Sequence, residues 1–193
     1  VLNLLFFHTG GKQGTQVSRA VGKSVSLQQL NGASREEFVS ALRPLFNNET
    51  WPLELAWESR PFGDVNELRA AIQVAVLTAD DSRRAALIHD YPAMDELLLA
   101  DADEAATISA DRGSLGLTDL DDVQTERITE LSAAYRERFD MPFVAYLDTN
   151  DTVDRVIDTG VRRLANSPEQ EYRTALGEIV EIANDRFDIL LAD

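Results

Sequence analysis

The chain has 193 residues, enough for one domain, and its hydrophobic and charged fractions of 44% and 27% are typical of a globular protein. It contains no cysteine, which excludes disulfides, thiolate metal sites and a cysteine nucleophile. Its two histidines, His8 and His89, are too few for a multi-histidine metal site. With 34 acidic and 18 basic residues, the formal net charge of −16 argues against binding nucleic acid or an anionic membrane surface.

The basic residues are unusual in kind, because only Lys12 and Lys23 among the 18 are lysines. Many acidic residues with almost no lysine are typical of a salt-adapted surface. A genome that favours arginine codons explains the composition equally well.

Residues 1–25 differ from the rest of the chain, since they hold three basic residues and no acidic one. We expect a poorly ordered leader here, or alternatively a short docking segment, followed by a helical domain at 26–193. The apolar run at 1–7 is too short to span a membrane, and no other stretch reaches the necessary length. We therefore expect a cytoplasmic protein that does not contact membranes.

From residue 26 onward, apolar residues recur at helical spacing. Ser34 and Glu37 form a capping-box signal, residues 118–121 repeat this signature, and Ser167 precedes a proline suited to a first helical position. Apolar faces follow at 38–46, 65–79, 120–139, 153–164 and 172–190. Residues 142–147 are short and apolar with no partner strand, so we expect an extended segment without a sheet. The pattern predicts an all-α protein with one domain of seven or eight helices.

Common catalytic motifs are missing from the sequence. There is no phosphate-binding loop, no dinucleotide fingerprint and no nucleophile elbow. The glycines at 113 and 116 indicate a turn. The polar run at 148–151 also indicates a turn, because it lacks the glycine and distal glutamate of a calcium loop.

Several sequence blocks occur in a fixed order between residues 30 and 187. They include SREEF at 34–38, LFNNETW at 45–51, RPF at 60–62, LSAAYRERFDMPFV at 131–144 and RLAN at 163–166. The ordered set resembles the 2-oxo-4-hydroxy-4-carboxy-5-ureidoimidazoline (OHCU) decarboxylases of urate degradation, whose corresponding long block is LNxxYRxRFGFPFI.

The resemblance implies an all-α fold and a decarboxylation that needs no cofactor and no metal. Loss of carbon dioxide leaves an electron pair that the carbonyl and imine groups of the imidazoline ring can absorb. The protein must bind the anionic substrate, desolvate its carboxylate and deliver a proton to one face of the ring, which gives (S)-allantoin.

The resemblance also implies catalytic residues. Without a gap in the alignment, Tyr91 occupies the position of the catalytic histidine in the family's His-Pro pair. A two-residue insertion would give this position to His89 instead. Asp111 takes the position of the catalytic glutamate.

Six residues are implied to bind the substrate: Arg112, Ile108, Pro92, Phe143, Val144 and Arg163. Ile108 and Arg112 stand where the family has serine and glutamine. In the long block, Ser132 replaces asparagine and Asp140 replaces glycine.

These differences change the chemistry. A tyrosine phenol titrates near 10, against about 6.5 for histidine, so Tyr91 is a hydrogen-bond donor rather than a base at neutral pH. Asp111 is one methylene shorter than glutamate, and misplacement by about 1 Å can cost about a hundredfold in rate. Arg112 adds a cation that can clamp a carboxylate.

Each candidate also has a purely structural explanation. His89 can be a surface residue at a helix end, Tyr91 a packed aromatic at a helix break, and Asp111 a helix or turn cap. Arg163 can belong to a surface ion pair with Glu171.

Two functions follow from these observations. The first is a carboxy-lyase that converts OHCU to (S)-allantoin, with a small anionic substrate and, as the resemblance implies, a homodimeric assembly. The alternative is an inactive or repurposed homologue that binds or regulates, or that acts on a related ureido-imidazoline acid.

Overall fold

The computed structural model of the protein describes residues 25–47, 49–99, 120–147 and 151–191. Within these ranges all regular elements are helical, which confirms the all-α class. Seven of the described α-helices have eight or more residues, in agreement with the expected seven or eight. Of the predicted leader, only Val25 is described, so the division at residue 25 stays a prediction.

The elements follow one another in the order α1 (Leu27–Gly32), α2 (Arg35–Leu42), the 3-10 turn η1 (Arg43–Leu45), α3 (Trp51–Glu58), α4 (Val65–Thr78), α5 (Asp81–His89), α6 (Met94–Leu99), α8 (Asp122–Phe139), α9 (Val153–Arg163) and α10 (Pro168–Leu190). None of the described helices is long and apolar enough to cross a membrane.

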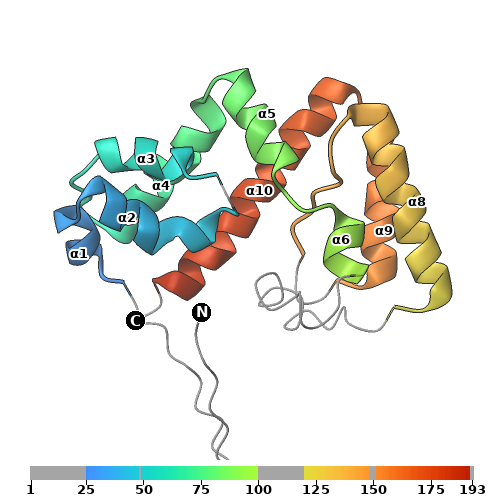
Figure 1. Ribbon diagram of the computed structural model, residues 1–193, viewed down its shortest axis with the longest axis horizontal. Helices are drawn as coiled ribbons and strands as arrows, with labels where there is room; N and C mark the ends of the chain where they lie inside the picture. Colours follow the sequence, from blue (N-terminus) through green and yellow to red (C-terminus); the bar gives the residue numbers. More distant parts are fainter. Residues whose placement is uncertain (1–24, 48, 100–119, 148–150, 192–193) are drawn as a thin grey trace, which may run out of the picture.

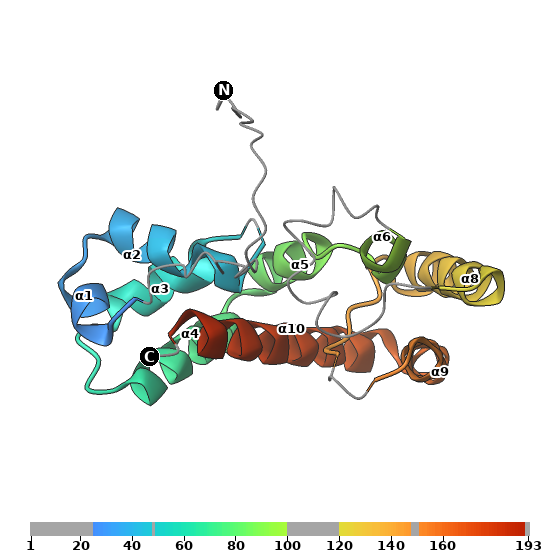
Figure 2. The same cartoon turned by 90° about the horizontal axis from the view of Figure 1, so that it is seen from below.

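The longest helix, α10, joins two groups of helices (Figures 1 and 2). Helices α1 to α4 lie beside its C-terminal part, while α8 and α9 lie beside its N-terminal part together with α6. Each group has its own core. The larger contains Phe38, Leu53 and Leu68, and the smaller contains Ile128 and Tyr135.

Local capping explains where several helices begin. The Ser34 hydroxyl accepts the Glu37 N–H, and the Glu37 carboxylate accepts the Ser34 N–H in return, as expected. Ser167 and Gln170 form the same arrangement at the start of α10, with Pro168 in its first turn. These two predicted helix starts are confirmed.

The start of α8 differs from the expected one. Of the signal at 118–121, Thr118 lies outside the described residues, and Asp121 is the cap. Its carboxylate accepts the Gln124 N–H at 2.8 Å, and the Gln124 side chain accepts the Asp121 N–H at 3.2 Å. Asp140 caps the C-terminus of α8 and has a left-handed backbone conformation, with φ 54°. The OHCU decarboxylases that this chain resembles have a glycine at this position, as is common where a helix ends in this conformation.

Residues 142–147 form no helix or strand, in keeping with the expected extended segment. Phe143 belongs to the smaller core, and Val144 belongs to the larger one. Neighbouring side chains on an extended backbone point in opposite directions, so the segment supplies both cores at once. It therefore lies along the seam between the two halves.

Candidate active site

Predicted site residues occur on two stretches of chain that cross the seam between the two cores, the first being residues 142–147. The connection between α5 and α6 also crosses it, because Tyr91 packs in the larger core and Met94 in the smaller. Val144 belongs to the same core as Tyr91, and both side chains are buried. Pro92, between Tyr91 and Met94, is half-buried.

His89 and Tyr91 differ sharply in their surroundings. His89 is the last residue of α5 and is exposed, while Tyr91 is only 5% exposed. A side chain that excludes water from a substrate carboxylate must itself be sheltered, and Tyr91 meets this condition. The two structural explanations, a surface histidine at a helix end and a packed tyrosine at a helix break, also fit these positions.

Arg163 is the predicted site residue with the most complete set of contacts. It ends α9, and its Nε and Nη2 groups donate to Glu171 Oε1 at 2.9 and 2.5 Å. The ion pair with Glu171 is therefore present, but its side chains are 9% and 0% exposed, so its expected position at the surface is wrong. The pair is buried because α9 turns into α10 within a few residues and folds Arg163 against it.

Helices α8 and α9 approach each other closely at Gly160. Gly160 lies on α9 against Leu131 and Phe143, and a Cβ there would come within 3.0 Å of the Phe143 ring. The Arg163 guanidinium lies 5.1 Å from the centre of the same ring, close enough for a cation–π contact. Phe143 and Arg163 are thus brought together, as the predicted site requires.

The buried Glu171 carboxylate has two further partners. The Tyr135 hydroxyl donates to Oε1 at 3.2 Å, and Asn166 Nδ2 donates to Oε2 at 2.7 Å. Burial is the main cause that raises the pKa of Tyr135, with Arg163 opposing the shift and Glu171 adding to it. Tyr135 is therefore a neutral donor at any pH at which the protein works.

Glu178 is the second carboxylate that contacts Arg163. Its Oε1 accepts from Arg163 Nη1 at 3.3 Å, and its Oε2 accepts the main-chain N–H of Tyr146 at 2.7 Å. Glu171 and Glu178 are seven residues apart on α10, about two turns, and so share one face of the helix. The Arg163 cation is thus surrounded by two carboxylates.

Sequence reasoning missed the roles of Tyr135, which lies in the long block of the resemblance, and of Glu178 on α10. The seven-residue spacing of the glutamates after an arginine was the available signal. Asp111, Arg112 and Ile108 lie outside the described residues, so their roles stay predictions.

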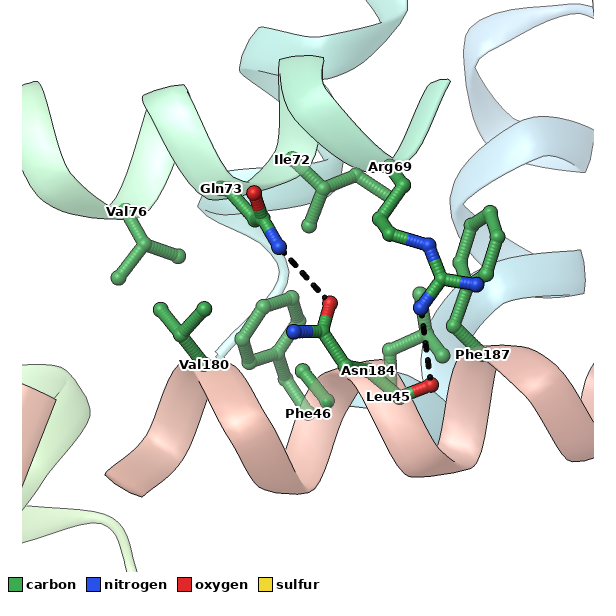
Figure 3. Close-up of a pocket in the computed structure, with 10 residues that line it drawn as sticks. Leu45, Phe46, Arg69, Ile72, Gln73, Val76, Val180, Asn184 and Phe187 are labelled. Carbon is green, nitrogen blue, oxygen red and sulfur yellow. Dashed lines mark hydrogen bonds between the residues drawn. The ribbon is translucent and has the colours of Figure 1, made fainter. Parts of the chain in front are cut away.

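A small cavity lies elsewhere, between η1, α4 and α10 (Figure 3). Its volume is about 10 Å³, room for about one water molecule. Gln73 Nε2 donates to Asn184 Oδ1 at 3.0 Å across it, and none of the predicted site residues lines it. The cavity is too small for a ureido-imidazoline acid, and it is not the candidate site.

Comparison with known proteins decides the family. A family model described as OHCU decarboxylase matches residues 31–188. The chain belongs to the OHCU decarboxylase family. It is 37% identical over 164 residues to the Haloferax volcanii protein named 2-oxo-4-hydroxy-4-carboxy-5-ureidoimidazoline decarboxylase, covering 84% of this chain and 94% of the relative.

Other members of the OHCU decarboxylase family agree. The protein of the same name from Mus musculus is 32% identical over 173 residues, covering 86% of this chain and 93% of the relative. A crystal structure of (S)-allantoin synthase shares the fold, with a TM-score of 0.64 and 22% identity over 84% of this chain. This chain spans about half, 53%, of the length of that solved chain.

Proposed function

We propose that this chain decarboxylates 2-oxo-4-hydroxy-4-carboxy-5-ureidoimidazoline to (S)-allantoin in urate degradation. The observation that carries the proposal is the family match over residues 31–188, which includes the blocks around Tyr91, Phe143 and Arg163. The contact between the Arg163 guanidinium and the Phe143 ring supports the proposal.

Arg163 binds the anionic substrate in this proposal. A guanidinium has five N–H donors, and the hydrogen bonds to Glu171 and Glu178 engage one on each of three nitrogens. In this proposal the other two N–H groups of Arg163 donate to the substrate anion. Glu171 fixes the side chain, so little freedom is lost when substrate binds.

The remaining roles follow from the resemblance. Tyr91 donates a hydrogen bond at the scissile carboxylate, and its burial supports this choice over the exposed His89. Asp111 carries the proton to the ring, and Arg112 contributes a second cation. Pro92, Ile108, Phe143 and Val144 enclose the ring and keep water away from it.

A turnover assay tests the proposed reaction. The unstable substrate is made in place from urate with uricase and hydroxyisourate hydrolase, and its disappearance is followed with and without this protein at low and at molar salt. We expect the protein to accelerate the loss of substrate in proportion to its concentration. Folded protein that gives only the spontaneous rate at every salt concentration would refute the proposal.

Single substitutions in the same assay distinguish the two possible registers. Tyr91→Phe removes only the hydroxyl, and we expect a loss of turnover of about a hundredfold, the lower range for removing one hydrogen-bond donor from an active site. His89→Ala serves as the comparison, with turnover unchanged. The reverse pattern would assign the role to His89.

We also propose that the protein is a homodimer and works in the cytoplasm. Exposed apolar side chains on α4 support an interface, since Val74 and Leu77 are 56% and 51% exposed and lie one turn apart. Light scattering of the wild type and of Leu77→Glu tests the assembly. Cell fractionation tests the location.

A further inference from the structure

We propose that Arg136 is a positioning residue of the decarboxylase, which fixes α6 against α8 and so sets the place of the turn formed by Tyr91 and Pro92. This inference rests on the proposed function, because that function assigns Tyr91 and Pro92 to the substrate. Arg136 itself contacts neither the substrate nor the reacting atoms in this proposal.

Arg136 links the last turn of α8 to the first turn of α6, which lies beside it (Figure 1). Its Nη2 group donates to Asp95 Oδ1 and Oδ2 at 3.3 and 3.4 Å, and lies 3.7 Å from Glu96 Oε1. Asp95 is only 15% exposed, so salt screens this pair less than it screens a fully exposed one. A charged contact therefore holds α6 on α8, in addition to the packing of Met94 in the smaller core.

The charged contact adds a direction that the apolar packing lacks. Burial of apolar surface is non-directional, whereas Arg136 pairs with carboxylates at fixed positions of α6. Ser132 lies one turn earlier on the same face of α8 and is buried, but its hydroxyl has no hydrogen-bond partner in the part of the chain that the structure describes. Among the described residues, the polar contacts between α8 and α6 are therefore those of Arg136.

A shift of α6 reaches Tyr91 through only two residues. Pro92 has a restricted φ, and the Ala93 N–H donates to Glu96 Oε2 at 3.2 Å, which ties the turn to α6. On the other side, the Tyr91 N–H donates to the Ile88 carbonyl at 3.2 Å in the last turn of α5. Because α5 packs in the larger core and α6 in the smaller one, the conformation of the turn depends on where α8 holds α6.

The substitution Arg136→Gln tests this assignment, because glutamine keeps a polar side chain and loses the charge. Arg127→Gln is the matched control. Arg127 also lies on α8 and also pairs with two carboxylates of a neighbouring helix, Asp154 and Asp158 of α9, each at 2.8 Å. Both arginines are partly exposed, so we expect both substitutions to lower the thermal unfolding midpoint by a similar, small amount.

Steady-state kinetics on freshly made substrate give the first readout. For Arg136→Gln we expect kcat/KM to fall by about 10- to 100-fold, since a misplacement on the order of 1 Å can cost about a hundredfold. Arg136→Lys keeps a cation that can pair with α6, and it should recover part of the lost kcat/KM. Arg127→Gln should match the wild type.

A double-mutant cycle with Tyr91→Phe gives the second readout, which a purely structural role of Arg136 would leave unchanged. If Arg136 acts through the position of the Tyr91 hydroxyl, Arg136→Gln should cost much less in the Tyr91→Phe background than in the wild type. An equal fold-loss of kcat/KM in both backgrounds would overturn the inference.

Three further results would overturn it, and they are distinguishable from one another. An active wild type in which Arg136→Gln is as active as Arg127→Gln refutes the positioning role alone. A folded but inactive wild type refutes the proposed function, and the positioning role with it. A loss explained entirely by unfolding of Arg136→Gln at the assay temperature refutes the positioning role and leaves Arg136 as a structural residue.

Discussion

Arg163 and Glu171 form an ion pair that is almost completely removed from water, with Nη2 and Oε1 2.5 Å apart and side chains 9% and 0% exposed. Burying two charges is costly, and the pair persists because Tyr135 and Asn166 also donate to the carboxylate. Removing one partner leaves the other charge uncompensated.

Glu171→Ala is therefore expected to lower the free energy of unfolding by about 3–5 kcal/mol, the usual cost of breaking a buried pair. Glu169→Ala on the same helix is the control, because its ion pair with Arg173 is exposed on both sides. That change should cost no more than about 1 kcal/mol. Urea denaturation measures both, and equal costs would contradict a structural role for the buried pair.

The hydroxyl of Tyr135 links stability to alkaline pH. Its pKa is raised, chiefly by burial, so the folded protein keeps the proton while the unfolded chain loses it as pH rises past about 10. The unfolded state then binds fewer protons than the folded state, and stability falls.

Tyr135→Phe should cost about 1.5–3 kcal/mol near neutral pH, where it removes a hydrogen bond to a charged group. The stability difference between wild type and variant should shrink above about pH 10, because phenylalanine does not ionise. Urea denaturation at several pH values measures both curves. A constant difference up to strongly alkaline pH would contradict the assignment.

Substitution of Gly160 on α9 tests the close contact of α8 and α9, and substitution of Gly177 on α10 is the comparison. Alanine is the better helix former, so Gly177→Ala, with open space around its Cβ, should stabilise by up to about 1 kcal/mol. Gly160→Ala should destabilise by about 1–3 kcal/mol, because its Cβ would overlap Leu131 and press on Phe143. Thermal unfolding shows whether each variant is more or less stable than the wild type. Stabilisation by Gly160→Ala would show that the helices are further apart than described here.

The net charge of −16 predicts a salt-dependent stability. Raising NaCl from 0.1 to 1 M shortens the screening length from about 10 to about 3 Å and weakens repulsion among the acidic residues. The free energy of unfolding should rise over this range. Chloride is the suitable anion, because sulfate also strengthens apolar burial. A flat or falling curve would favour the codon-usage explanation of the composition.

Local signals made most of the fold predictable. Ser34 with Glu37 and Ser167 with Pro168 specify helix starts from within a few residues, and the structure confirms both. The start of α8 was harder to place, because Thr118 and Asp121 are both capping residue types and lie three residues apart. Residues 142–147 were predicted as extended from their length and apolar character alone.

The candidate site was less predictable, because its contacts join distant segments. Glutamate is almost never fully buried unless paired, so Glu171 was expected at the surface. Arg163 at the end of α9 and Tyr135 on α8 both donate to this carboxylate on α10, so its burial depends on contacts among three helices. None of these distances can be derived from spacing in one segment. The sequence supplied Arg163 and named Glu171 as a possible ion-pair partner, but it indicated neither the burial of this pair nor the second carboxylate, Glu178.

The handedness of the product tests the central claim most directly. Allantoin formed from freshly generated OHCU would be followed by circular dichroism, since spontaneous decarboxylation gives both enantiomers and a protein-held ring receives its proton on one face. We predict (S)-allantoin in clear excess, formed at a rate proportional to enzyme. Racemic allantoin at the spontaneous rate, from protein shown to be folded, would contradict the account.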